Sequence, residues 1–128
     1  MRPAVFLFYD WKRLAFFKDK TIEAADRAAP SLVIFDEIHM YTKTHRENID
    51  AISELYRFAG HHDIFLLCAT HRIFDLPPDI RAMITEFICF KMTELRDLNY
   101  IKETWGEPAA GLVKRLKKTQ FVRLSFAA

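Results

Sequence analysis

Two adjacent carboxylates, Asp36 and Glu37, directly follow the apolar run 32–35 (LVIF). A short continuous apolar run is typical of a strand buried on both faces of a parallel sheet, so both carboxylates are expected at a strand's C-terminal end. Open α/β sheets bind their ligands at that edge. There, an aspartate can hold Mg²⁺, usually through water, and an adjacent glutamate can polarise an attacking water. Solvated turn residues and helix caps produce the same local pattern, so the motif alone leaves both interpretations open.

A second polar pair, Thr70 and His71, follows the apolar run 64–69 (IFLLCA). At the end of a strand beside the acidic one, either side chain can donate a hydrogen bond to the terminal phosphate of a nucleoside triphosphate. His71 can do so without a permanent charge. A loop histidine that caps the next helix has the same local sequence, so the two interpretations of His71 stay open.

The elements that must position these residues are predicted from periodicity. Apolar runs recur at 5–9, 32–35, 64–69 and 86–90, with helical patterns between them. This alternation predicts an α/β fold, with a mostly parallel sheet of at least four strands and helices on both faces. A helix is expected at about 21–29, before Pro30, and a second at 44–59, with a Thr44–Glu47 capping box and a stop at Gly60. A third is expected to begin at Pro77-Pro78, and a fourth to run from Thr93 to Gly106.

The predicted domain organisation is a core over residues 1–106 and a C-terminal segment over residues 107–128. The segment carries a basic run, Lys114, Arg115, Lys117 and Lys118, and then an alternating pattern over 121–126 that predicts an edge strand. The basic run is a candidate contact for nucleic-acid phosphates, but such runs are usually a solvated face.

The composition limits the class of protein. The chain has 128 residues, is 51% hydrophobic and 28% charged, and carries a formal net charge of +2, which fits a soluble globular protein and is too mild to indicate nucleic acid by itself. Cys68 and Cys89 lie in apolar runs without metal-ligand spacing, so we expect buried, reduced thiols in a cytoplasmic protein. No apolar stretch approaches the roughly 18 to 20 residues of a membrane span.

Together these motifs resemble P-loop ATPases of the FtsK and HerA-like branch, and more closely its phage and zonular-occludens-toxin-like members. The resemblance runs from residue 32 to about residue 105, somewhat over half of the chain. The matching residues are 32–39 (LVIFDEIH), 60–62 (GHH), 69–72 (ATHR) with 76–77 (LP), 87–90 (FICF), 93–94 (TE) and 97–98 (DL). Several members of the branch carry Gln at the position of His71.

The resemblance implies an ATP-driven motor for DNA translocation, packaging or virion extrusion, with ATP and Mg²⁺ as cofactors. It implies that Asp36 coordinates Mg²⁺, that Glu37 is the catalytic base, and that Thr70 or His71 senses the terminal phosphate. It also implies a homo-oligomer, with DNA as a candidate partner and an arginine that reaches the neighbouring subunit's phosphate. Arg57, Arg72 and Arg81 are the candidates for that arginine, and the sequence does not choose among them.

One departure from the family concerns the Walker A loop. The three glycines, Gly60, Gly106 and Gly111, lie in no Gly-x-x-x-x-Gly-Lys-Ser/Thr string, and no glycine precedes the acidic strand. We therefore expect the C-terminal part of an ATPase core from its second strand onward, either truncated or degenerate. Alone, it is expected to bind nucleotide poorly and to be inactive.

Two other classes of function remain open. A metal-dependent hydrolase or nuclease could use Asp36, Glu37, His39, His61, His62 and His71, all competent metal ligands. A non-catalytic interaction module could use the aromatic-rich start, Phe6, Phe8, Tyr9, Trp11, Phe16 and Phe17, to pack on a partner.

Overall fold

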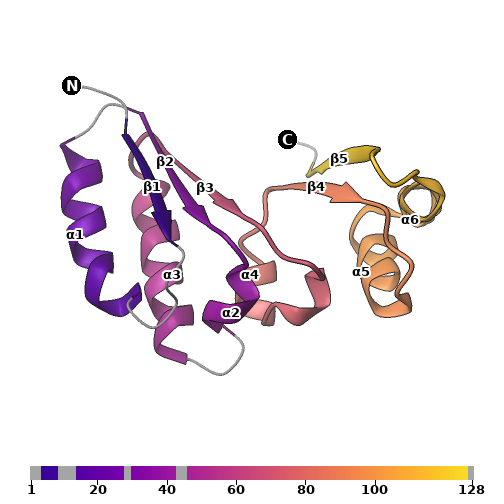
Figure 1. Cartoon of the computed structure of the whole chain (residues 1–128), viewed down its shortest axis with the longest axis horizontal. Helices are drawn as coiled ribbons and strands as arrows, with labels where there is room; N and C mark the ends of the chain where they lie inside the picture. Colours follow the sequence, from indigo (N-terminus) through magenta and orange to yellow (C-terminus); the bar gives the residue numbers. More distant parts are fainter. Residues whose placement is uncertain (1–3, 9–13, 28–29, 43–45, 127–128) are drawn as a thin grey trace. The chain divides into compact units, whose positions relative to one another are not determined.

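The computed structural model describes residues 4–8, 14–27, 30–42 and 46–126. It divides into two compact units (Figure 1): unit 1 comprises residues 1–71 and 75–80, and unit 2 comprises residues 72–74 and 81–128. The predicted capping residue Thr44 and the aromatic residues Tyr9 and Trp11 lie outside the described residues, as do the side chains of Phe8, Phe16 and Phe17.

Unit 1 contains a three-stranded parallel sheet, as the predicted α/β fold requires. Its strands are β1 (Ala4–Phe8), β2 (Ser31–Phe35) and β3 (Ile64–Cys68), in the order β1-β2-β3. The register pairs Phe6 with Val33 and Val33 with Leu66, so these three side chains share one face. Val33 and Phe35 of the central strand are buried, which places the core of unit 1 on that face.

The helices of unit 1 are α1 (Leu14–Asp26), α2 (Ile38–Thr42) and α3 (Arg46–Ala59). Helix α1 begins seven residues before the predicted start at Thr21, and α3 ends immediately before Gly60, as predicted. The apolar stripe of α3 supplies Ile49, Ile52 and Leu55 to the core. Two shorter helices follow β3: a 3₁₀ turn, η2 (Ile73–Asp75), and α4 (Pro78–Arg81).

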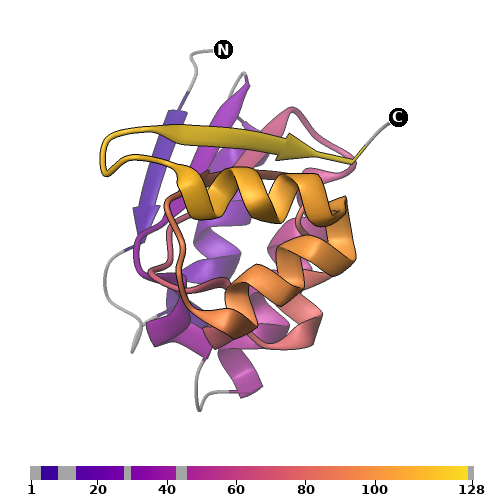
Figure 2. The ribbon, with the colours of Figure 1, turned by 90° about the vertical axis from the view of Figure 1, so that its right-hand side faces the viewer.

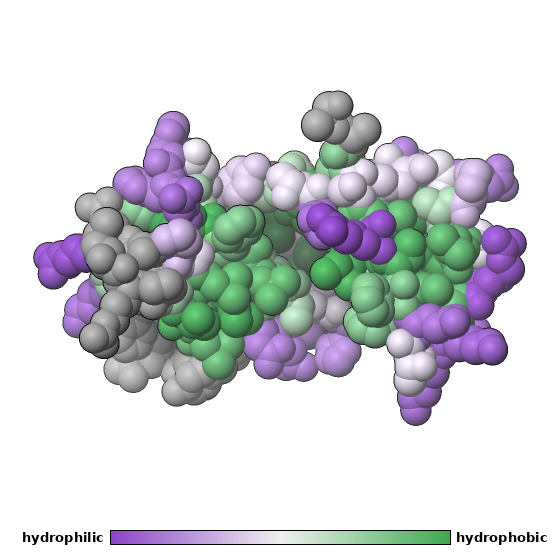
Figure 3. All heavy atoms as spheres, turned by 90° about the horizontal axis from the view of Figure 1, so that it is seen from above, coloured by the Kyte–Doolittle hydropathy of each residue, from purple (hydrophilic) through white to green (hydrophobic). Residues whose placement is uncertain are grey.

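The opposite face of this sheet is apolar and exposed. Val5, Leu7, Phe65 and Leu67 are between 49% and 72% exposed, and Figure 3 shows apolar side chains at the surface of this unit. Helices are predicted on both faces of the sheet, but α1 and α3 pack against each other on one face (Figure 1). The reason is the strand order: successive right-handed crossovers that advance in one direction place their helices on the same side.

Unit 2 is a two-stranded ribbon packed on two helices. Strands β4 (Glu86–Phe90) and β5 (Phe121–Ser125) pair antiparallel, and helices α5 (Leu95–Trp105) and α6 (Glu107–Arg115) lie beside them (Figure 2). The core holds Cys89, Ile101 and Val113, with Phe87 and Val122 packed against it. Gly106 separates the two helices at φ 99°, a conformation that favours glycine.

The predicted fourth parallel strand is therefore corrected. The run 86–90 does form a strand, but among the described residues it pairs only with β5. The apolar run 86–90 does not by itself distinguish parallel from antiparallel pairing. Burial alternates along β5, with Val122 and Leu124 turned inward, as in an antiparallel ribbon that packs one face on helices. The expected edge strand near residue 121 is confirmed.

The two cysteines differ in environment. Cys89 is buried, as expected, whereas Cys68 at the end of β3 is exposed. Among the described helices, none combines the length and apolar character needed to cross a membrane.

Candidate functional site

The ends of β2 and β3 are joined by backbone hydrogen bonds just beyond the sheet. The Ala69 N–H donates to the Phe35 carbonyl at 3.0 Å, and the Ile38 N–H donates to the Ala69 carbonyl at 2.8 Å. Residues 36–37 and 70–71 therefore emerge side by side at the C-terminal edge of the parallel sheet. This is the edge at which the sequence predicts the acidic and polar residues to meet.

Glu37 has an unusual backbone conformation. Its φ of 50° is the one positive value among the described non-glycine residues. The left-handed region costs an L-residue about 1–2 kcal/mol, and the turn is held by a hydrogen bond from the Met40 N–H to the Glu37 carbonyl at 2.9 Å. The turn buries Ile38 completely and leaves the Glu37 side chain exposed. Strain of this kind in a non-glycine residue is characteristic of functional sites.

The Glu37 carboxylate contacts His71. Oε1 of Glu37 lies 3.0 Å from Nε2 of His71, so this ring nitrogen donates a hydrogen bond to the carboxylate in the tautomer that protonates Nε2. The two side chains are 54% and 76% exposed. A pair this open to water contributes at most about 1 kcal/mol to stability. Its geometry therefore serves to orient the carboxylate more than to hold the fold together.

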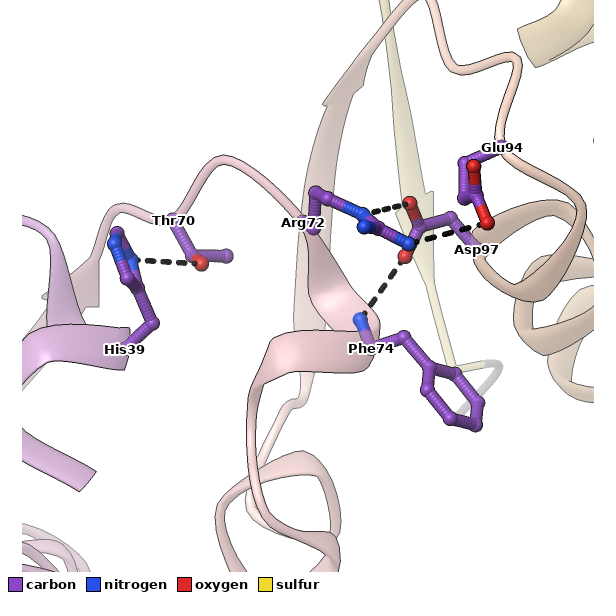
Figure 4. A network of polar contacts seen from close by, with 6 residues as sticks. All are labelled: His39, Thr70, Arg72, Phe74, Glu94 and Asp97. Carbon is purple, nitrogen blue, oxygen red and sulfur yellow. Dashed lines mark hydrogen bonds and ion pairs between the residues drawn. The ribbon is translucent and has the colours of Figure 1, made fainter. Parts of the chain in front are cut away.

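His39 and Thr70 form a second contact between the same two loops. Nδ1 of His39 lies 3.3 Å from Oγ1 of Thr70, a pair that Figure 4 shows, and the rings of His39 and His71 are 5.6 Å apart between centroids. Glu37, His39, Thr70 and His71 thus make one cluster. His39 belongs to the run 32–39 that resembles the ATPases, but the sequence predicts a role for it only in the metal-site alternative.

Asp36 is exposed and makes no ion pair or side-chain hydrogen bond with any described residue. Nor does any group of three or more His, Cys, Asp and Glu side chains in the described ranges have the geometry to hold a metal ion. His61 and His62 lie before β3, at the opposite end of that strand from His71, and the His62 ring stacks on Phe58 at 4.0 Å. The metal-hydrolase alternative is not supported.

A separate network in unit 2 anchors the residues that follow His71. Asp97 of α5 is 2% exposed, and its carboxylate accepts hydrogen bonds from Arg72 Nε at 3.3 Å and from the Phe74 N–H at 3.0 Å. Arg72 also pairs with Glu94 at 3.3 Å (Figure 4). This role of Asp97 is not among those predicted from the sequence. The available signal was a carboxylate one helical turn before Ile101, on the buried stripe of α5.

The three candidate bridging arginines have different surroundings. Arg72 is engaged by Asp97 and Glu94, and the Arg81 guanidinium lies 4.6 Å from the centre of the Phe74 ring, a cation–π contact. Arg57 on α3 is exposed and has no ion pair with a described residue.

Burial also affects the chemistry of Cys89. Desolvation, together with the nearby charge of Asp97, raises the pKa of the Cys89 thiol to about 11. The thiol therefore stays protonated at neutral pH and is a packing residue rather than a nucleophile.

Known structures resemble this chain in fold. The structure of B204, the DNA-packaging ATPase from Sulfolobus turreted icosahedral virus, matches with a TM-score of 0.76 and 27% identity, over 92% of this chain and 60% of that one. The genome-packaging NTPase B204 from Sulfolobus turreted icosahedral virus 2, in complex with AMP, matches with a TM-score of 0.72 and 18% identity, over 98% and 77%.

The search of curated proteins found no match to the chain. The model of the ATPase family associated with various cellular activities (AAA) matches residues 17–92, which is more than half of the chain and includes β2, β3 and the whole Glu37–His71 cluster. The chain therefore belongs to the AAA family of ATPases.

Proposed function

We propose that this chain supplies the acidic strand (Walker B) and the sensor strand of an ATP-driven motor that translocates, packages or extrudes nucleic acid, in the FtsK and HerA-like branch. The observation that carries the proposal is the 3.0 Å contact between Glu37 and His71, made across the ends of two neighbouring parallel strands. The 27% identity to a viral DNA-packaging ATPase supports the motor class.

In this proposal Glu37 is the catalytic base. The hydrogen bond from His71 Nε2 holds the carboxylate in one orientation, which favours proton transfer from an attacking water. Thr70 or His71 reports the terminal phosphate, since each carries a donor at the same strand end. Asp36, exposed and unpaired among the described residues, fits a carboxylate that holds Mg²⁺ through water, a mode that needs few protein ligands. Bound Mg²⁺ neutralises charge on the phosphate oxygens.

The remaining parts of the motor are proposed as follows. Phosphate binding needs a glycine-rich loop, and the sequence contains no such string, so we expect low nucleotide affinity from these residues alone. A homo-oligomer would supply a cation from the adjacent subunit, and Arg57 is the candidate that is exposed without an ion-pair partner in the described part of the chain. A cytoplasmic location is proposed from the two cysteines, which form no disulfide.

The test joins these residues to a strand–loop–helix segment with a Gly-x-x-x-x-Gly-Lys-Thr loop and measures phosphate release and nucleotide affinity. Glu37→Gln should keep nucleotide binding and lower turnover by roughly 100-fold or more, as expected for loss of a general base. Asp36→Asn should instead weaken the binding of Mg²⁺-nucleotide.

Glu47→Gln is the matched control, because Glu47 is an exposed carboxylate in the first turn of α3 that forms no hydrogen bond or ion pair with a cluster residue. It should leave both quantities unchanged. Unchanged turnover in Glu37→Gln, or an equal loss of binding in Glu37→Gln and Asp36→Asn, would contradict the assigned roles.

A further inference from the structure

Unit 2 presents an exposed aromatic pair at one end of its ribbon. Phe90 and Phe121 are register partners in β4 and β5, and their ring centroids lie 5.8 Å apart. They are 54% and 60% exposed, although their strand neighbours Cys89 and Val122 turn into the core. The packing of unit 2 therefore does not require these two rings, and their outer surfaces are available to a ligand.

Five basic residues lie close to Phe90 or Phe121 in the sequence: Lys91, Lys114, Arg115, Lys117 and Lys118. Lys91 directly follows Phe90, Lys114 and Arg115 end α6, and the other two lie in the turn before Phe121. All five are exposed, and none forms an ion pair with any residue that the structure describes. The sequence from residue 108 onward contains no Asp or Glu, so the four cations from Lys114 to Lys118 have no acidic residue among their neighbours in that segment.

The turn that carries Lys117 and Lys118 is held in place by two hydrogen bonds. The Gln120 N–H donates to the Lys117 carbonyl at 2.9 Å, and the Lys117 N–H donates to Oε1 of Gln120 at 2.9 Å. A closed turn fixes the backbone from which these cations project and the point at which β5 begins with Phe121. Less ordering is then required when a ligand binds.

We infer that this ribbon end, made of Phe90, Phe121 and the five cations, binds single-stranded nucleic acid. Cations without partners attract phosphates, and exposed aromatic rings stack on unpaired bases. Both features occur together here, and a duplex would use only the first because its bases are already stacked. This surface is separate from the residues of the proposed ATPase site. The inference rests on the proposed motor function only in identifying the bound strand as the polymer that the motor would move.

The experiment measures binding of a fluorescent 20-nucleotide single strand, and of a duplex of equal length, by anisotropy across a salt series. We expect the single strand to bind more tightly than the duplex. Lys117→Glu/Lys118→Glu should weaken binding at least tenfold, and should reduce the slope of log K against log salt by about 1.4, since each lost phosphate contact contributes about 0.7. Phe121→Leu should weaken binding at least about fivefold by loss of stacking.

Two matched controls separate this surface from general charge and hydrophobicity. Lys20→Glu/Lys102→Glu makes the same charge change at exposed helical positions, and Phe65→Leu removes an exposed ring from the sheet of unit 1. Both should change affinity less than twofold. Circular dichroism checks that every variant is folded.

The inference is overturned if the single strand does not bind at 50 mM salt, if the duplex binds at least as tightly, or if the controls lose as much affinity as the surface variants. Glu37→Gln distinguishes this result from the proposed function. It should leave strand binding unchanged, so failure at one site does not count against the other.

Discussion

Replacement of Asp97 by asparagine tests the anchor that follows His71. The carboxylate is buried and accepts from Arg72 and from the Phe74 N–H. Asparagine has nearly the same shape and keeps an oxygen for Phe74, but it loses the charge that pairs with Arg72. Hydrogen bonds to charged groups contribute about 1.5–3 kcal/mol each. Arg72 is 42% exposed, so water replaces part of the lost interaction.

We therefore expect Asp97→Asn to lower the free energy of unfolding of unit 2 by about 2 kcal/mol, and Asp97→Ala by about 3 kcal/mol because the Phe74 N–H is then unsatisfied as well. Glu94→Gln is the matched control. Glu94 pairs with the same arginine but is 53% exposed, so its neutralisation should cost at most about 0.5 kcal/mol.

Urea unfolding followed by tryptophan fluorescence measures these changes. Trp105 packs in the core of unit 2, and a Trp11→Phe background makes it the only tryptophan. Equal losses in Asp97→Asn and Glu94→Gln would refute the reasoning, since burial is the property that distinguishes the two carboxylates.

Three other predictions follow from the same structure. Gly106→Ala should lower the free energy of unfolding by about 1–3 kcal/mol because the φ of Gly106 is 99°. Gly111→Ala should raise it by about 0.5–1 kcal/mol, because Gly111 lies inside α6 and the added carbon makes only an ordinary 3.7 Å contact. Urea unfolding in which both variants change the free energy in the same direction would count against this. In a Cys68→Ser background, the free energy of unfolding should fall by about 2 kcal/mol between pH 9 and 11. The reason is that burial raises the pKa of Cys89 to about 11 in the folded state, so the unfolded chain loses this thiol proton at lower pH. The Cys89→Ala variant of that background should lack this decrease. The chain should self-associate through the exposed sheet face of unit 1. The double variant Phe65→Lys/Leu67→Lys should therefore lower the mass measured by light scattering after size exclusion. A wild-type chain that is monomeric at every concentration would show that this face does not drive association.

The strand ends were the most predictable part of the molecule. The apolar runs before Asp36 and Thr70 have no competing helical period, and parallel pairing then brings their ends together. The partner of β4 was not predictable from its own sequence, because pairing depends on a strand more than thirty residues away. Helix α6 was missed because Gly111 and a short apolar stripe, Val113 with Leu116, give a weak signal that only packing reinforces. The role of Asp97 could not be predicted from the sequence, because it depends on where the loop with Arg72 and Phe74 lies.

The left-handed backbone at Glu37 has a consequence for how this chain would change under selection. Asparagine and glycine adopt such a φ more readily than glutamate does, so variants at this position that lose the acid would gain stability. A library screened only for folded, abundant protein should therefore drift away from glutamate at residue 37. A library screened for turnover in a complete motor should retain it. If Glu37 is the base that we propose, the identity of this residue would then record whether selection acts on turnover or only on the fold.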